Sequence, residues 1–207
     1  MTPLPTRGLY AVTDPALTQE RGLLACVEQA LRGGAAAVQY RDKSAPPATA
    51  LARARALLSL CRSHAVPLIV NDDVELAAAC GADGVHVGRD DAAVRHARER
   101  LGPDAIIGAS CYHDFVLAQR AVADGASYVA FGRFFASRTK PGQALATPEL
   151  LHQARARLAV PVVAIGGITA ANAATLVAAG AQLLAVVHDL WSGEDCAARA
   201  RALCRCF

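Results

Sequence analysis

Eight short runs of mostly aliphatic residues recur along the chain, and each is separated from the next by a longer segment with helical periodicity. Parallel strands that are buried on both faces have such near-continuous apolar sequences. The runs are Gly8–Val12, Ala36–Arg41, Leu68–Asn71, Gly84–Val87, Ala105–Ala109, Tyr128–Phe131, Val162–Ile165 and Leu183–Val187. Their alternation with helical segments predicts βα units on a parallel sheet, because parallel strands need a long crossover connection.

The segments between the runs are predicted to be helices, and many of them are followed by glycine, where helices commonly end. They are Thr18–Leu31, Pro47–Ser63, Asp73–Ala79, Asp90–Leu101, His113–Ala123, Pro148–Leu158, Ala170–Ala179 and Ala197–Leu203. Eight βα units in about 200 residues match the smallest (β/α)₈ barrels, whereas an open doubly wound sheet has fewer strands and leaves an edge. The sequence therefore predicts an α/β protein with a TIM-barrel fold, as a single domain over residues 1–207.

Composition excludes several classes of protein. A net charge of +3, from 21 basic and 18 acidic residues, is too small and dispersed for a nucleic-acid surface, so no nucleic-acid partner is expected. No apolar stretch is long enough to span a membrane, and none is expected as a partner. The seven cysteines show neither a disulfide framework nor zinc-ligand spacing, which favours the cytoplasm. Assembly into a homo-oligomer is left open.

Polar side chains follow most of the predicted strands, at the end where barrel enzymes carry their active sites. After the second strand, Gln39, Arg41 and Lys43 stand two residues apart, which puts an amide and two cations on one side of an extended chain. This arrangement suits a polyanion. The alternative is simple alternation along a half-exposed strand.

Two acidic clusters follow the third and fourth strands, namely Asn71–Asp72–Asp73 and Arg89–Asp90–Asp91. Carboxylates from neighbouring strand ends can hold Mg²⁺, whose remaining ligands are waters and substrate phosphates. Alternatively, Asp72 or Asp73, and Asp90, only begin helices. His86 lies within an apolar run and is expected to be an interior histidine with its hydrogen bonds satisfied.

The later strands also end in polar groups. Ser110 has no base partner that the sequence reveals, so a hydrogen-bonding role is expected, while Cys111 is expected to be a packing residue. The long loop over residues 132–143 combines hydroxyls, cations and glycine, an inventory suited to binding phosphate, although its arginines could be merely exposed. Gly166–Gly167 precedes a helix, as in phosphate sites of barrel enzymes.

Six short motifs stand at the ends of six different predicted strands and run in order through nearly the whole chain. They are Gln39–Tyr40–Arg41–Asp42–Lys43, Asn71–Asp72–Asp73, Asp83–Gly84–Val85–His86–Val87–Gly88, Ile107–Gly108–Ala109–Ser110, Ser137–Arg138–Thr139–Lys140 and Ala164–Ile165–Gly166–Gly167–Ile168. Each motif alone is a weak signal, but their combination closely resembles the thiamine-phosphate synthase family.

The resemblance implies a transferase with two small-molecule substrates. It would join 4-amino-2-methyl-5-hydroxymethylpyrimidine diphosphate to 4-methyl-5-(2-phosphoethyl)thiazole and release thiamine phosphate and pyrophosphate. It also implies Mg²⁺ as the cofactor, with Asp72 and Asp91 as metal ligands. Because ionisation of the diphosphate develops charge on the leaving pyrophosphate, a dissociative mechanism that needs cations and no protein nucleophile is expected.

The resemblance further implies roles for individual residues. The pyrimidine diphosphate would be held by Gln39, Tyr40, Arg41, Asp42, Lys43, Asn71, Ser110 and Lys140. The thiazole phosphate would be held by Ser137, Arg138, Thr139, Gly167, Val187 and His188. The implied catalytic residues are Arg41, Lys43, Ser110 and Lys140.

The chain departs from the family pattern at three positions. Arg89 stands where many relatives have Gln, which leaves Asp91 as the aligned metal ligand but makes Asp90 a competitor. His188 stands where many have Ser, so backbone N–H groups or an imidazole would contact the phosphate there. Ser137 replaces a common Thr and preserves the hydroxyl.

Two other functions are compatible with the same barrel. A related thiazole tautomerase typically has His where this chain has Arg133, and it tends to lack the metal and diphosphate residues that are retained here. A binding protein without turnover would keep the phosphate cradle, but it would not need a magnesium site.

Overall fold

The computed structural model describes residues 2–88, 91–135 and 145–207. Within them, parallel strands form a closed barrel in chain order, because β1 pairs with both β2 and β8. The strands are β1 Gly8–Val12, β2 Ala37–Tyr40, β3 Leu68–Asn71, β4 Gly84–Val87, β5 Ile106–Tyr112, β6 Tyr128–Gly132, β7 Val162–Ile165 and β8 Leu183–Val186. The predicted TIM-barrel fold is confirmed.

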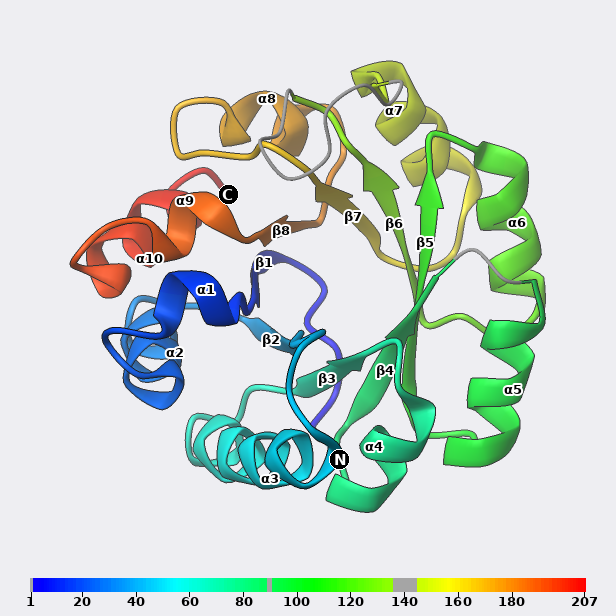
Figure 1. The fold of residues 1–207 in the computed structure, drawn as a ribbon. Coiled ribbons are helices and arrows are strands. Elements are labelled where there is room, and N and C mark those ends of the chain that lie inside the picture. The colour runs from blue at the N-terminus through cyan, green and yellow to red at the C-terminus, as the bar shows by residue number, and fades with distance from the viewer. Residues whose placement is uncertain (1, 89–90, 136–144) are drawn as a thin grey trace.

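The helices surround the barrel as an outer layer (Figure 1). They are α1 Pro15–Thr18, α2 Leu23–Arg32, α3 Pro47–Ser63, α4 Val74–Cys80, α5 Asp91–Leu101, α6 Phe115–Ala123, α7 Pro148–Arg157, α8 Ala173–Ala178, α9 His188–Trp191 and α10 Cys196–Cys204. None of the helices in the described part of the chain is long and apolar enough to cross a membrane.

The structure differs from the predicted elements mainly between β1 and α2. The helix predicted over Thr18–Leu31 begins later, as α2 at Leu23, because Gly22 adopts a positive φ of 81° and is the N-cap of that helix, while Thr18 is the last residue of the separate helix α1. The first helix begins before Thr18, where the Asp14 side chain accepts a hydrogen bond from the Ala16 N–H and caps it. The short helix α9 was not predicted, because it follows β8 without a separating turn signal.

Side chains of the strands alternate between the barrel interior and the helix layer. The interior cluster comprises Tyr10, Val12, Ala37, Ile69, Ile106, Tyr128, Ala130, Val163, Leu183 and Ala185. The intervening residues pack in a separate, larger cluster against the helices. This period of two gives the polar residues at the strand ends one of two directions, toward the barrel axis or toward the helices.

Tyr128 occupies interior space that the sequence leaves open for it. A Cβ atom at Gly108 would lie 2.0 Å from Cζ and 2.2 Å from the hydroxyl oxygen of Tyr128, closer than these atoms can approach. The Tyr128 ring also meets the Tyr10 ring edge to face, with centroids 5.9 Å apart. Glycine at position 108 is therefore required by a tyrosine on the next strand.

Candidate functional site

The segment after β2 is held in place from β1. The buried Thr13 hydroxyl accepts a hydrogen bond from the Arg41 N–H at 2.8 Å and donates one to the Arg41 carbonyl at 3.1 Å. The Thr13 N–H donates to the Gln39 carbonyl at 2.9 Å, which extends the pairing beyond the strands. These bonds set the direction in which Arg41 and Lys43 leave the barrel.

Two residues predicted to bind the pyrimidine diphosphate have side chains that are engaged within the protein. The Tyr40 side chain packs on the outer face of β2, in the cluster beneath the helices. The Asp42 carboxylate is fully buried and accepts hydrogen bonds from Ser44, Ala45 and Arg53. Burial alone would raise the pKa of Asp42, but these hydrogen bonds outweigh it and lower the pKa. Asp42 thus organises its own loop.

The segment after β3 separates the roles of its two acids. Asp73 caps α4, since its carboxylate accepts the Leu76 N–H at 2.8 Å. Asp72 has a left-handed φ of 62°, and its carboxylate accepts a hydrogen bond from the Asn71 amide at 2.8 Å. It also lies 3.8 Å from Lys43 Nζ on the neighbouring loop, with the Lys43 and Asp72 side chains 65% and 54% exposed. The helix-cap alternative therefore holds for Asp73 and not for Asp72.

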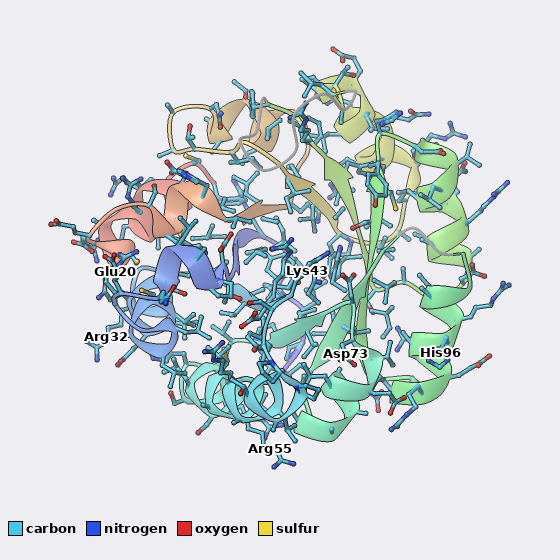
Figure 2. The ribbon with its side chains drawn as sticks, viewed as in Figure 1. Glu20, Arg32, Lys43, Arg55, Asp73 and His96 are labelled. Carbon is cyan, nitrogen blue, oxygen red and sulfur yellow. The ribbon has the colours of Figure 1, made fainter. Side chains whose placement is uncertain are left out.

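Lys43 and Asp72 bring a cation and a carboxylate from adjacent strands to the mouth of the barrel, the opening at the carboxyl ends of the strands. Figure 2 shows Lys43 over the middle of the barrel, whereas Arg32 and Arg55 lie on the outer helices. Lys43 is thus separated from these arginines of the outer helices.

Of the two acids predicted to ligate Mg²⁺, the structure describes the side chain of Asp72, whose carboxylate is of the type that Mg²⁺ takes. No group of three or more His, Cys, Asp or Glu side chains gathers within residues 2–88, 91–135 and 145–207. Mg²⁺ is commonly held by one or two carboxylates, with waters and substrate phosphate oxygens as its other ligands, and the exposed Asp72 carboxylate is a ligand of this kind. Asp91 begins α5, but its side chain, like residues Arg89 and Asp90, lies outside the described part.

A continuous series of hydrogen bonds crosses the barrel interior. We call it the interior network; its members, in order, are Gln39, Tyr10, Tyr128, His86 and Ser110. The successive distances are 3.0 Å from Gln39 Nε2 to the Tyr10 hydroxyl, 2.8 Å between the two tyrosine hydroxyls, 2.9 Å to His86 Nδ1 and 2.8 Å from His86 Nε2 to Ser110 Oγ. It joins two residues predicted to bind the same substrate.

The interior network corrects the expectation that Ser110 lacks a base partner. His86 contacts its hydroxyl, but burial lowers the pKa of His86 to about 4, which makes the imidazole a weak base. Asp72 raises that pKa only as a smaller effect. The expectation that His86 is an interior histidine with its hydrogen bonds satisfied is confirmed, and the hydrogen-bonding role expected of Ser110 fits this geometry.

Backbone groups dominate the opposite side of the mouth, after β7 and β8. Gly166 and Gly167 both have a positive φ, of 103° and 68°, and a Cβ atom on Gly166 would lie 2.3 Å from that of Arg133. Asn172 donates to the Gly167 carbonyl at 3.0 Å and accepts from the Thr169 N–H at 2.8 Å, which fixes this turn. Val187 and the exposed His188 lie at the start of α9.

The loop over residues 132–143, which was expected to be suited to binding phosphate, is only partly described. Ser137, Arg138, Thr139 and Lys140 lie outside the described residues. On the near side of this segment, the Phe135 N–H donates to the Gly166 carbonyl at 3.2 Å. On the far side, the Ala146 N–H donates to the Arg133 carbonyl at 2.8 Å. Both ends of the segment thus reach the β6 and β7 side of the mouth.

The structure adds three residues that the sequence analysis missed. Thr13, Tyr10 and Tyr128 support the segment after β2 and the interior network, yet none lies in a recognisable motif. The available signal was the presence of Tyr10 and Tyr128 within apolar strand sequences, since a buried tyrosine needs a hydrogen-bond partner for its hydroxyl.

The family model described as thiamine monophosphate synthase matches residues 9–190. A thiamine-phosphate synthase of Thiobacillus denitrificans is 56% identical over 200 residues, covering 97% of this chain and 94% of that protein. A thiamine-phosphate synthase of Marinobacter nauticus is 53% identical over 202 residues, covering 97% of this chain and 90% of that protein. Among solved structures, a thiamine phosphate pyrophosphorylase from Pyrococcus furiosus is 32% identical, with a TM-score of 0.87 and coverage of 97% and 95%.

Proposed function

The chain belongs to the thiamine monophosphate synthase family, and on that premise we propose that its barrel is a catalytic domain, over residues 1–207, that makes thiamine phosphate. The two substrates are 4-amino-2-methyl-5-hydroxymethylpyrimidine diphosphate and 4-methyl-5-(2-phosphoethyl)thiazole. The observation that carries the assignment to this site is the approach of Lys43 to Asp72 at the mouth. We also assign the enzyme to the cytoplasm, because its cysteine pattern favours a reducing compartment.

The pyrimidine diphosphate lies, in this proposal, over β2, β3 and β5. Arg41 and Lys43, with Lys140 from the loop after β6, face the diphosphate oxygens, since cations at this place offset their charge. Asn71, Gln39 and Ser110 supply neutral hydrogen bonds to the rest of the molecule. Tyr40 and Asp42 act by shaping the segment after β2, which is supported by the engagement of their side chains elsewhere.

The metal in this proposal is Mg²⁺, held by Asp72 and Asp91 together with diphosphate oxygens. When bound there, it supplies positive charge next to the oxygens that become the leaving pyrophosphate. Asn71 and Lys43 orient the Asp72 carboxylate through the two contacts described above.

The proposed reaction is a dissociative substitution at the methylene carbon of the pyrimidine. The bond from this carbon to the diphosphate oxygen breaks, and the oxygen leaves with the electron pair. Arg41, Lys43 and Lys140 stabilise the negative charge that develops on it. The thiazole nitrogen then forms a bond to the carbon with its own electron pair, so no protein nucleophile is needed. Catalysis is mainly electrostatic stabilisation and positioning.

The thiazole phosphate binds, in the same proposal, on the β7 and β8 side of the mouth. Gly167 and Val187 offer backbone N–H groups, and Ser137, Arg138, Thr139 and His188 offer side chains. The positive φ of Gly166 and Gly167 supports this role, because such a turn exposes backbone N–H groups to an anion.

The test is the formation of thiamine phosphate from both substrates by the purified protein, with product and pyrophosphate measured together. We expect equal amounts of the two products with Mg²⁺ present and a loss of turnover in excess chelator that is restored by added Mg²⁺. No product from folded protein that binds the thiazole phosphate would reject the synthase assignment. Turnover that is undiminished in chelator would reject the metal.

A further inference from the structure

The interior network has a direction that follows from what each of its groups can donate and accept. Burial raises the pKa values of Tyr10 and Tyr128 well above the ordinary value, so both hydroxyls keep their hydrogens. Gln39 presents its amide nitrogen to Tyr10, and this nitrogen only donates. Within the described part of the chain, the Tyr10 hydroxyl contacts Gln39 Nε2 and the Tyr128 oxygen, so its hydrogen is donated to the Tyr128 oxygen.

The direction of the hydrogen bonds extends from Tyr128 through His86 to Ser110. With the Tyr10 hydrogen between the two phenol oxygens, the Tyr128 hydroxyl donates to His86 Nδ1. A neutral imidazole that accepts at Nδ1 carries its hydrogen on Nε2, which donates to the Ser110 oxygen. If Tyr128 instead donated its hydrogen to Tyr10, the buried Tyr10 hydroxyl would be left without an acceptor among these residues. A buried donor without an acceptor costs the full free energy of its desolvation.

We propose that Tyr10, Tyr128 and His86 are positioning residues that fix Ser110 as a hydrogen-bond donor toward the substrate. Because the Ser110 oxygen already accepts from His86, its own hydrogen is left to point into the mouth. The substrate atom that meets Ser110 is then an acceptor, such as a ring nitrogen or a diphosphate oxygen. A hydrogen-donating exocyclic amino group is rejected at that place.

The network is built into the barrel walls on several sides. Its members come from β1, β2, β4, β5 and β6, so each hydroxyl and ring is held by a different strand. The His86 and Tyr128 rings are stacked, with centroids 5.5 Å apart and planes inclined by 25°. Gly108 leaves the space that the Tyr128 hydroxyl needs to reach both partners. The two rings are thus packed against each other, and the Tyr128 ring lies against the backbone at Gly108.

The tautomer of His86 can be measured in the absence of catalysis. Nitrogen-15 NMR distinguishes the two neutral tautomers of a histidine. At neutral pH we expect His86 as the pure Nε2–H tautomer in the wild-type protein, with the exposed His152 as a tautomer mixture in the same spectrum. If His86 in the wild-type protein were the Nδ1–H tautomer or a mixture of both, the proposal would be overturned.

Two tyrosine variants form a matched pair that tests the direction of the hydrogen bonds in the interior network. Tyr128→Phe removes the donor to His86 Nδ1, so we expect a shift toward the Nδ1–H tautomer or a mixture. Tyr10→Phe removes a hydroxyl of the same chemistry one step away, and Tyr128 can still donate to His86. We therefore expect the Nε2–H tautomer to persist in Tyr10→Phe. Equal tautomer changes in both variants would overturn the assigned direction.

The role toward substrate rests on the proposed function and is tested by kinetics. We expect Tyr128→Phe to lower kcat/KM for the pyrimidine diphosphate about tenfold, the effect of one misdirected hydrogen bond, with the KM for the thiazole phosphate unchanged. Combining it with Ser110→Ala should cost no more than Ser110→Ala alone, because Tyr128 acts through Ser110. Additive losses would reject this role. If the wild-type protein showed no turnover, the proposed function would be rejected. The NMR measurement would still test the direction of the hydrogen bonds in the interior network.

Discussion

At the scale of single residues, His86 shows how burial decides the state of a titratable group. Its pKa of about 4 in the folded protein lies below the ordinary value of 6.5. At pH values between about 4 and 6.5, His86 is protonated in the unfolded chain but stays neutral in the folded protein. The free energy of unfolding should therefore fall as the pH falls from about 6.5 to 4, by about 3 kcal/mol in total.

Urea unfolding between pH 7 and 4, without added metal, measures this dependence. His86→Gln should remove the contribution of one proton to this pH dependence, and His152→Gln, a change at an exposed position, is the control substitution. Identical slopes in all three proteins would contradict the neutral, buried His86.

The adjacent acids Asp72 and Asp73 give a second contrast at this scale. Asp72→Asn removes a proposed metal-ligand charge and should lower synthase turnover by a factor of about 100 or more. Asp73→Asn keeps a good helix cap, so both turnover and stability should stay near wild-type values. Turnover at saturating Mg²⁺ and thermal unfolding of both variants check this. Equal turnover in the two variants would remove Asp72 from the metal site.

At the scale of elements, the segment after β2 depends on β1. Thr13→Val keeps the shape of the side chain but leaves the Arg41 N–H and carbonyl without their partner. We expect a loss of about 2 kcal/mol in the free energy of unfolding, together with a raised KM for the pyrimidine diphosphate. Denaturant unfolding and steady-state kinetics measure the two effects.

Thr18→Val is the matched control for that change. The Thr18 hydroxyl donates to the Asp14 carbonyl, which also accepts the Leu17 N–H within the same short helix. Its loss should change stability by less than about 1 kcal/mol and leave the KM unaltered. An unchanged KM in Thr13→Val would mean that Arg41 does not need this support.

At the scale of the whole molecule, closure of the barrel joins the two ends of the chain. β1 pairs with β8, and the Arg21 guanidinium donates to the carbonyls of Leu17, Trp191 and Gly193. Arg21→Met removes a charged donor shared by the first and last βα units. It should lower the free energy of unfolding by about 2–4 kcal/mol while leaving kcat unchanged.

The surface arginine Arg32 provides the comparison for Arg21→Met. It pairs with Glu28 one turn away on α2, and its side chain is 69% exposed. Arg32→Met should therefore cost no more than about 0.5 kcal/mol in denaturant unfolding. If the two variants lost equal stability, the link between the ends of the barrel would contribute nothing beyond an ordinary surface pair.

The sequence alone determined the barrel and the ring of residues around its mouth. Near-continuous apolar runs in short strands, helical segments between them and glycine after the helices each reflect local backbone and burial preferences. For this reason β1, β3, β4, β7 and α3 were predicted with the bounds that the structure has. The same alternation of apolar runs and helical segments placed Gln39, Asp72 and Ser110 at strand ends.

Only the tertiary structure decided what those side chains do, because hydrogen-bond partners lie far apart in the chain. Asp73 rather than Asp72 caps α4, and the Asp42 carboxylate serves its own loop. Ser110 meets His86 across 24 positions, and His86 meets Tyr128 across 42. Closure of the barrel brings these strands together, and the exclusion of water from its interior makes each of their hydrogen bonds obligatory.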